Sequence, residues 1–418
     1  MAHSHYHKPG IERYDFDPKL KTVSFILMGV GLLLFVLGVF FNMDYPTRIW
    51  TTMLHNTYYF LGLGLLGMFY VAAQTMGYSG WVILVSRIPE AMARVVPVFS
   101  AILAAVLVLG YKSIYHWAHE GIMDPASGHY DELIAGKEGF LNPVFFFGAT
   151  AVYLGLWSLL TLAITNNSYS HDSDPGMKRY TRSRLLSMVF LFVFAISSST
   201  ALWHWLMSID PHWFSTLYGW YCFISLFVGA ISTTILIAIY LKDKGYLQNV
   251  NVEHFHDLGK WMFAFSVAWA YLWFAQFMLI WYGNIPEETL YFVDRYENYK
   301  ILFFLNFCIN FMLPFLVLMT ARAKRSKYVL SFIATMLIFG HWLDYYLLAM
   351  PGAVKGAAYV HDGHTIHNFG IGPLEIGYPM IMAGLFMFLV FNTLSKHSLV
   401  PVNHPFLRQS YEHHTNSI

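Results

Sequence analysis

Ten apolar stretches constrain the fold of this chain more than any other feature. A helix needs about 20 consecutive apolar residues to cross the hydrocarbon core of a bilayer. The stretches cover residues 22–41, 53–75, 95–113, 142–165, 184–206, 217–241, 259–282, 299–320, 328–349 and 373–394. They predict an all-α polytopic membrane protein with ten transmembrane helices. The membrane domain is expected to cover residues 22–394, between an N-terminal tail (1–21) and a C-terminal tail (395–418).

The composition agrees with a membrane protein and excludes some other classes. Hydrophobic residues make up 57% of the chain and charged residues only 12%, and the mean hydropathy is +0.48. The formal net charge is +1 and no dense basic patch is present, so we expect no nucleic-acid partner. Cys222 and Cys308 lie in separate apolar runs and form no C-x-x-C pair. This spacing argues against iron–sulfur and zinc-thiolate sites in this chain.

Lysine and arginine residues predict the orientation of the helices. If the N-terminus is cytoplasmic, 19 of the 25 basic residues fall in inside segments and six in outside segments. This asymmetry follows the positive-inside rule, so both termini are predicted to be cytoplasmic. The first stretch has no small-residue cleavage site, and we expect it to be retained as a helix.

The run Ala195–Tyr221, AISSSTALWHWLMSIDPHWFSTLYGWY, joins two of the apolar stretches through a short polar and aromatic turn. Trp and Tyr prefer the membrane interface, whereas His and Asp in a membrane are costly without a partner or a task. The run therefore predicts a helical hairpin whose tip lies at a water interface.

His-Trp pairs recur at residues 116–117, 204–205 and 341–342, each near the predicted outer end of a helix. The recurrence suggests two similar four-helix bundles, helices 2–5 and helices 6–9, flanked by helices 1 and 10. Interfacial preference of Trp alone would give the same pairs, so the repeat stays a hypothesis.

Titratable residues gather near the predicted outer ends of several helices. The candidates for quinol binding or proton transfer are His55, His204, Asp210, His341 and Asp344. His341 and Asp344 share a helix face, so the carboxylate can orient the imidazole and raise its basicity. Such pairs suit quinol oxidation, which needs a base for each hydroxyl proton, and they also suit a proton wire without a quinone. Alternatively, these side chains cap helix ends or bind phospholipid headgroups.

A second group of candidates lies at the predicted inner ends of helices. The candidates for proton entry are Glu90, Arg94, His256 and Asp257. In the middle of the membrane, Ser197–Thr200 are expected to face Ser232–Thr234, where hydroxyl groups allow close packing or support a water chain. Glu90 inside and Asp344 or Asp210 outside would then outline a proton path.

The histidine positions argue against a haem wire across the membrane. His55, His204 and His341 all lie in predicted outer halves, whereas such a wire needs bis-histidine haems at two depths. The spacing leaves a single outer haem open, and a haem–copper centre needs more helix histidines than this chain has. We assign no catalytic residue and no metal ligand to this chain.

The segment WHWLMSIDPHWFSTLYGWY, together with the ten-helix layout, resembles the NrfD-like family of polysulfide-reductase membrane subunits. More closely, it is similar to the ActF family of bacterial alternative complex III, a quinol:electron-acceptor oxidoreductase. The resemblance covers essentially the whole chain. It implies the two four-helix bundles described above and a place in the bacterial inner (cytoplasmic) membrane.

The resemblance also implies partners and the location of the cofactors. The implied partners are a multihaem cytochrome c subunit, an iron–sulfur subunit, a sister NrfD-like subunit, small membrane subunits, a terminal oxidase and phospholipids. Haem c and iron–sulfur clusters would lie in the partner subunits, and this chain would hold no cofactor. The acidic loops 114–141 and 283–298 fit docking to a periplasmic partner and fit a solvated surface equally well.

The expected function is that of a membrane subunit that contributes scaffold, and proton translocation as a further role, to quinol oxidation. One alternative is that the chain holds a quinol site itself, at the periplasmic side. Another is a secondary transporter, although no pair of Gly- or Pro-broken helices occurs at matching positions in the two halves.

Overall fold

The computed structural model describes residues 10–360 and 370–414, and this part of the chain is built from helices. Within these ranges, ten helical segments are long and apolar enough to cross a membrane, as the sequence predicts. They are α1 (Pro18–Phe40), α2 (Pro46–Met76), α3 with α4 (Arg87–Ala93, Val96–Ile114), α6 (Pro143–Ser170), α7 (Met177–Trp205), α8 (Leu217–Asp243), α9 (Val252–Gly283), α11 with η4 and α12 (Lys300–Phe307, Cys308–Met312, Leu313–Val317), α14 (Lys327–Val360) and α15 (Pro373–Lys396). The chain is therefore a multi-pass membrane protein.

Most helices extend beyond the apolar stretches that predict them. α2 begins at Pro46 and not at residue 53, because proline suits the first turn of a helix and the polar residues after it continue the helix outside the hydrocarbon core. α14 continues past Pro351 to Val360, although its apolar stretch ends at residue 349. Hydropathy detects only the part of a helix that lies in the apolar core, so it underestimates helix length.

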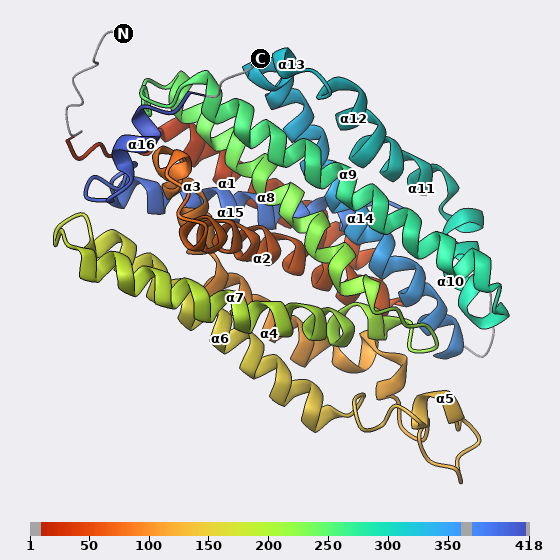
Figure 1. The fold of residues 1–418 in the computed structure, drawn as a ribbon. Coiled ribbons are helices and arrows are strands. Elements are labelled where there is room, and N and C mark those ends of the chain that lie inside the picture. The colour runs from red at the N-terminus through yellow and green to blue at the C-terminus, as the bar shows by residue number, and fades with distance from the viewer. Residues whose placement is uncertain (1–9, 361–369, 415–418) are drawn as a thin grey trace.

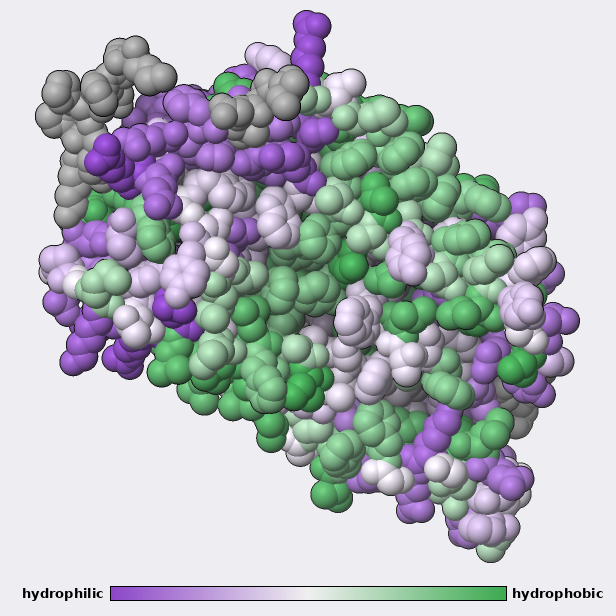
Figure 2. All heavy atoms as spheres, viewed as in Figure 1, coloured by the Kyte–Doolittle hydropathy of each residue, from purple (hydrophilic) through white to green (hydrophobic). Residues whose placement is uncertain are grey.

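The long helices lie side by side, and shorter elements gather at the two ends of the molecule (Figure 1). We call one end the terminal face, because α1 begins and α15 ends there; it also carries α3, α13 (Ala321–Arg325) and α16 (Leu407–Tyr411). The other end, the loop face, carries α5 (Glu132–Ala135) and α10 (Pro286–Asn298). Figure 2 shows hydrophobic residues over the middle of the surface and hydrophilic residues toward both ends, as expected for a chain that crosses a bilayer.

α2 and α8 form the centre of the helix assembly. α2 packs against α4, α7, α8, α14 and α15, and α8 packs against α2, α7, α9 and α14. These two helices are the most deeply buried of the ten. Polar side chains on their inward faces must therefore find partners in other helices or in buried water, because lipid does not reach them.

Glycines bring α1 and α15 into close contact at the edge of the assembly. A Cβ atom on Gly377 would lie 2.7 Å from the carbonyl oxygen of Gly31, and one on Gly384 would lie 2.6 Å from that of Ser24. Both distances are shorter than a methyl group allows, so only glycine permits this approach. Small residues serve the same purpose at other membrane helix interfaces.

The C-terminal segment packs on the terminal face. Asn403 donates to the carbonyl oxygens of His171 (2.9 Å) and Asp172 (2.8 Å), and Ser410 donates to that of Trp81 (2.5 Å). The predicted tails are thus partly ordered, while residues 1–9 and 415–418 of these tails lie outside the described residues.

Candidate functional site

α14 carries His341 and Asp344, and both side chains are buried inside a membrane-spanning helix; Asp344 is 1% exposed. They are three positions apart in the sequence, so they lie on one face of α14. That face is turned toward α8 and α9, which supply their hydrogen-bond partners. An ionisable side chain at this depth is costly unless its surroundings compensate, so its partners matter.

Four neutral side chains donate hydrogen bonds to the Asp344 carboxyl group. Oδ1 accepts from the hydroxyl of Tyr221 and from Nδ2 of Asn306 at 2.8 Å. Oδ2 accepts from Oγ of Ser225 at 2.8 Å and from Nε1 of Trp269 at 3.0 Å. A carboxylate is an acceptor only, so these donors suit its ionised form, but they supply no full positive charge. The carboxyl is therefore held in place by groups that leave it able to take up and release a proton.

Ser225 connects His341 to Asp344. Its Oγ lies 3.0 Å from His341 Nδ1 while it also bonds to the carboxyl, so the expected contact between the two residues is indirect. Nε2 of His341 is buried and has no hydrogen-bond partner among the described residues. The imidazole therefore ends a short hydrogen-bonded chain that begins at the carboxyl.

A π-helical turn, η4, brings two asparagines into this centre. Asn310 donates to Oδ1 of Asn306 at 2.6 Å, and Asn306 in turn donates to Asp344. Asn310 packs so closely on Gly340 of α14 that a Cβ atom there would clash with its amide oxygen. Single π turns inside helices occur often at functional sites. Neither asparagine was among the predicted site residues, although two amides four residues apart in an apolar stretch are a usable signal.

A cavity of about 30 Å³ lies beside Asp344, and Gln276 and Arg295 line it together with Asn306. Nε2 of Gln276 is buried and finds no acceptor within the described chain. Arg295 belongs to α10 at the loop face, and its guanidinium lies 3.4 Å from the ring centroid of Tyr291. The cavity has room for one or two water molecules, whereas sites for organic ligands are about tenfold larger or more.

Glu90 forms a second buried acidic centre, in α3 at the terminal face. Arg87 donates to Oε2 of Glu90 at 2.8 Å and to Oδ2 of Asp172 at 2.6 Å. Ser168 accepts from Arg87 at 2.9 Å and donates to Oε1 of Glu90 at 2.9 Å. The Arg87 side chain is fully buried, and its single charge is shared between two carboxyl groups.

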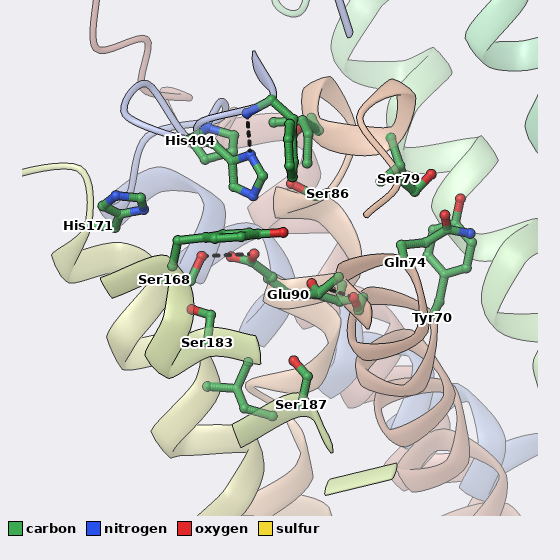
Figure 3. Close-up of a pocket in the computed structure, with 18 residues that line it drawn as sticks. Tyr70, Gln74, Ser79, Ser86, Glu90, Ser168, His171, Ser183, Ser187 and His404 are labelled. Atoms are coloured by element: carbon green, nitrogen blue, oxygen red, sulfur yellow. Dashed lines mark hydrogen bonds between the residues drawn. The ribbon is translucent and has the colours of Figure 1, made fainter. Parts of the chain in front are cut away.

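A cavity of about 40 Å³ lies next to Glu90 (Figure 3). Its polar lining consists of Tyr70, Gln74, Thr75, Ser79, Ser86, Glu90, Ser168, His171, Tyr180, Ser183, Ser187 and His404. The hydroxyl oxygens of Tyr70, Tyr180 and Ser187 are buried and lack a hydrogen-bond partner in the described part of the chain. Buried water is found where such groups line a cavity of this size. The arrangement therefore gives Glu90 a hydrated neighbour at the terminal face.

The histidines of this cavity are held neutral. Burial, together with the nearby His171 and Arg87, lowers the pKa of His404 to about 3. Burial also lowers the pKa of His171. At neutral pH both imidazoles can accept and donate hydrogen bonds without carrying charge. His404 was not among the predicted site residues, because only the folded C-terminal segment brings it to the cavity.

Aromatic side chains separate the two acidic centres. Asp344 lies roughly 25 Å along α14 from Lys327 at the terminal face, at a rise of about 1.5 Å per residue. Tyr70 lines the cavity beside Glu90. Its ring centroid lies 6.3 Å from that of Phe227 on α8 and 5.8 Å from that of Trp261 on α9. Tyr70 thus connects the lining of this cavity to packed rings on α8 and α9.

The prediction that Ser197–Thr200 face Ser232–Thr234 is wrong, as the contacts of Ser197, Ser199 and Ser232 show. Ser197 accepts from Nε1 of Trp157 on α6 at 2.8 Å, and Ser232 lies 3.4 Å from Sδ of Met262 on α9. α7 and α8 run in opposite directions, and Ser199 packs on Gly219 in the first turn of α8. Ser232 is more than three turns farther along, so the two groups lie at different depths.

His204 lies in an aromatic cage, although its His-Trp pair echoes that of His341. Phe140 stacks on the imidazole with ring centroids 4.0 Å apart. The ring centroids of Phe145 and Tyr153 lie 5.2 and 6.3 Å from that of the imidazole. The imidazole is fully buried, and neither nitrogen makes a hydrogen bond of ordinary geometry with the described residues. The two histidines therefore have opposite surroundings, one polar and one apolar.

His55 and Asp210 do not join the Asp344 centre. Nδ1 of His55 bonds to the carbonyl oxygen of Thr51 at 2.8 Å, and its Nε2 bonds to Asn56 at 3.0 Å. Asp210 lies at the loop face, 3.4 Å from Nζ of Lys355. Both side chains are already partnered in ways that stabilise the local structure.

The remaining inner candidates make no hydrogen bond to Glu90 within the described part of the chain, although Arg94 and Arg87 lie over the same Tyr169 ring. Arg94 donates to Oδ1 of Asn166 at 2.5 Å. Asp257 accepts from Nζ of Lys260 at 2.5 Å and from Nε2 of His413 at 2.7 Å, and His256 lies 3.8 Å from the same carboxyl group. This cluster anchors the C-terminal segment to α9.

Among the described residues, no group of three or more His, Cys, Asp or Glu side chains is placed to hold a metal ion. Comparison with known proteins finds neither a matching family model nor a similar curated protein.

Proposed function

We propose that this chain is a cofactor-free membrane subunit of a respiratory quinol:electron-acceptor oxidoreductase of the alternative complex III type, similar to its ActF subunits. Its role is to conduct protons across a bacterial cytoplasmic membrane and to hold partner subunits together. The partners carry the haem c groups and iron–sulfur clusters: a multihaem cytochrome c, an iron–sulfur protein and a sister NrfD-like subunit, together with small membrane subunits.

The buried carboxyl group of Asp344 carries this proposal. An ionisable side chain within a membrane span, held only by neutral donors, is a recurrent feature of proton pathways. Ser225 and His341 offer the next positions for a proton that leaves the carboxyl, through hydrogen bonds of 2.8 and 3.0 Å. Scaffold function alone gives no reason for an ionisable side chain at this depth.

The centre at Glu90 supports a path with access at both ends. Glu90 adjoins one water-sized cavity at the terminal face, and Asp344 adjoins another toward the loop face. Phe227 and Trp261 pack with ring centroids 5.9 Å apart, and in this proposal they interrupt the water chain between the two cavities. Protons would therefore cross only when these rings or bound waters move, as coupling to an electron-transfer partner requires.

The distribution of basic residues supports a cytoplasmic terminal face with both termini inside. The helix contacts support two four-helix bundles: α2, α4, α6 and α7 pack as one group, and α8, α9, α11–α12 and α14 as the other. α1 and α15 pair with each other outside these groups. The polar centre at Asp344 then belongs to the second bundle, and the cage of His204 occupies the corresponding place in the first.

At the Asp344 centre, the observed geometry favours proton conduction over a quinol site, and the helix breaks argue against a transporter. The cavity of about 30 Å³ at Asp344 suits water and not a quinone ring. A transporter of this kind would have a pair of broken helices. In this chain the third span is interrupted between α3 and α4, and the eighth span is interrupted at η4. These two spans do not correspond when helices 2–5 are matched with helices 6–9, so they do not form the paired broken helices of that class.

Purification of the tagged chain from its native membrane tests the assignment to a complex. We expect c-type haem absorbance and an iron–sulfur subunit to co-purify in mild detergent. Purification of the chain alone, without haem, would contradict the proposal.

The proton role is tested with the purified complex in vesicles. Asp344→Asn is expected to lower the number of protons released per electron during quinol oxidation. Asp243→Asn is the matched control, because Asp243 is a half-exposed carboxylate that pairs with Lys327 at the terminal face. Equal proton release in the wild type and both variants would exclude Asp344 from the path.

A further inference from the structure

A groove of about 380 Å³ lies at the loop face, between the loop after α5 and the connection of α7 to α8. Its walls are mainly aromatic, with Phe140, Trp203, Trp213 and Phe214, and Lys137 is its basic member. The groove has the volume of a site for an organic ligand. None of its lining residues belongs to the two acidic centres.

Two indole N–H groups in the groove wall lack an acceptor. Nε1 of Trp203 and Nε1 of Trp213 are buried and have no hydrogen-bond partner among the residues that the structure describes. Trp213 is 3% exposed, and its ring stacks on Tyr291 at 3.7 Å, which fixes its orientation. A buried donor without an acceptor is costly, so a ligand whose acceptor oxygens reach these N–H groups would be stabilised by them.

Lys137 adds positive charge to the same wall. Its Nζ donates to the carbonyl oxygen of Pro211 at 2.5 Å and lies 5.4 Å from the ring centroid of Phe214. An ammonium group has three protons, so two are left for a ligand. Burial lowers the pKa of Lys137, so an anion beside it would stabilise the charged form.

The nearby carboxylates of Asp210 and Asp131 offset part of the charge of Lys137 through space, but they do not line the groove. Asp210 pairs with Lys355 at 3.4 Å, and Asp131 bonds to His212 at 2.6 Å. The groove thus presents donors and positive charge, which complement an anion with several acceptor oxygens.

An exposed apolar stripe continues from the groove toward the middle of the membrane. Ile196 and Phe192 lie seven and eleven residues before Trp203, so the three share one face of α7. Ile196 is 59% exposed and Phe192 is 70% exposed. A donor-rich groove at the end of a span with an apolar stripe along the span matches one molecule, a phospholipid, whose phosphate lies at the interface and whose acyl chains lie in the core.

We propose that this groove binds one glycerophospholipid from the loop-face leaflet, with its phosphate held by Lys137 and by the indole N–H groups of Trp203 and Trp213. The acyl chains lie along Ile196 and Phe192. Because Phe140 belongs both to the groove wall and to the cage of His204, the bound lipid holds this cage closed. The site does not depend on the proposed proton role.

Native mass spectrometry of the delipidated full-length chain, titrated with phosphatidylglycerol, tests the proposal. Lys137→Gln and Trp213→Phe each remove one donor and keep most of the side-chain volume. Lys112→Gln and Trp220→Phe are the matched controls: Lys112 is an exposed loop-face lysine, and Trp220 is an exposed tryptophan of α8. Melting temperatures close to that of the wild type confirm that the variants fold, and Trp203→Phe replaces any variant that does not.

The wild type and both controls are expected to bind one phosphatidylglycerol more tightly than the surrounding lipids. Lys137→Gln and Trp213→Phe should each weaken this binding about tenfold, as loss of one good hydrogen bond to a charged group predicts. Inorganic phosphate should not compete, because it has no acyl chains. Equal affinity in the variants and their controls, competition by phosphate alone, or a quinone bound in place of the lipid would overturn the proposal.

Discussion

The hydroxyl group of Ser225 lies 2.8 Å from Oδ2 of Asp344. The same oxygen lies 3.0 Å from Nδ1 of His341, so one side chain of α8 connects two ionisable side chains of α14. A hydroxyl group can donate to one neighbour while it accepts from another. A proton can therefore move between the carboxyl and the imidazole without a direct contact between them.

The contrast between His341 and His204 predicts opposite effects of one substitution. His341→Phe should impair proton release per electron, because it removes the end of the chain that begins at Asp344. His204→Phe should leave turnover unchanged and keep or raise the melting temperature, because it replaces buried unpartnered nitrogens in an aromatic cage. Turnover and thermal unfolding of the purified complex measure both effects. Loss of quinol oxidation in His204→Phe alone would instead favour a quinol site at the first bundle.

Removal of Arg87 is expected to destabilise the terminal face strongly. Arg87→Ala leaves the buried carboxyl group of Glu90 and the partly buried one of Asp172 without their cation, at a cost of about 3–5 kcal/mol in unfolding free energy. Addition of Glu90→Gln and Asp172→Asn should recover much of this loss, because the neutral side chains need no cation. Thermal unfolding in detergent measures both steps. A triple variant no more stable than Arg87→Ala would show that packing of the arginine, and not charge, is decisive.

The close contact of α1 and α15 predicts that a single methyl group is enough to disturb it. Gly377→Ala should lower stability by about 1–3 kcal/mol, because its Cβ would lie 2.7 Å from the carbonyl oxygen of Gly31. Gly29→Ala is the matched control on α1, since nothing lies within 4 Å of its added Cβ atom. The melting temperature of Gly377→Ala should therefore be lower than that of Gly29→Ala. A similar decrease in both would mean that the loss reflects helix flexibility and not the contact.

The neutral state of His404 predicts a loss of stability on acidification. Its pKa is about 3 in the folded chain and about 6.5 when unfolded, so between these values the unfolded chain binds a proton that the folded chain does not. The contribution of His404 to the free energy of unfolding should thus fall as the pH decreases from 6.5 toward 3. His404→Gln should weaken this dependence, and His129→Gln, at an exposed loop position, should not. Melting temperatures between pH 7.5 and 5 test this, and parallel curves for both variants would contradict it.

Much of the fold follows from local sequence patterns. The ten apolar stretches predict the ten spanning helices, because each stretch meets the length criterion independently of its neighbours. Helix ends were less accurate: proline and polar residues continue α2 and α14 beyond the apolar core. The break before α4 and the π turn at η4 were missed, because hydropathy averages over such local changes in backbone geometry.

The composition of the candidate site depended on contacts between distant parts of the chain. Sequence spacing predicted that His341 and Asp344 share a helix face, since both lie on one helix. It did not identify Tyr221, Trp269 or Asn306, because these lie on other helices and meet Asp344 only through packing.

Hydropathy and charge distribution in the chain are sufficient to establish a multi-pass helical membrane protein, because insertion into a bilayer depends on the local free energy of transfer of each segment. Both positions have the same His-Trp pair. The pair therefore does not determine which histidine has polar surroundings and which lies in an aromatic cage. That difference arises from the neighbouring helices: α8 supplies Ser225 to His341, whereas the loop before α6 supplies Phe140 to His204. The same local sequence thus acquires different chemistry because burial makes each side chain depend on the groups packed around it.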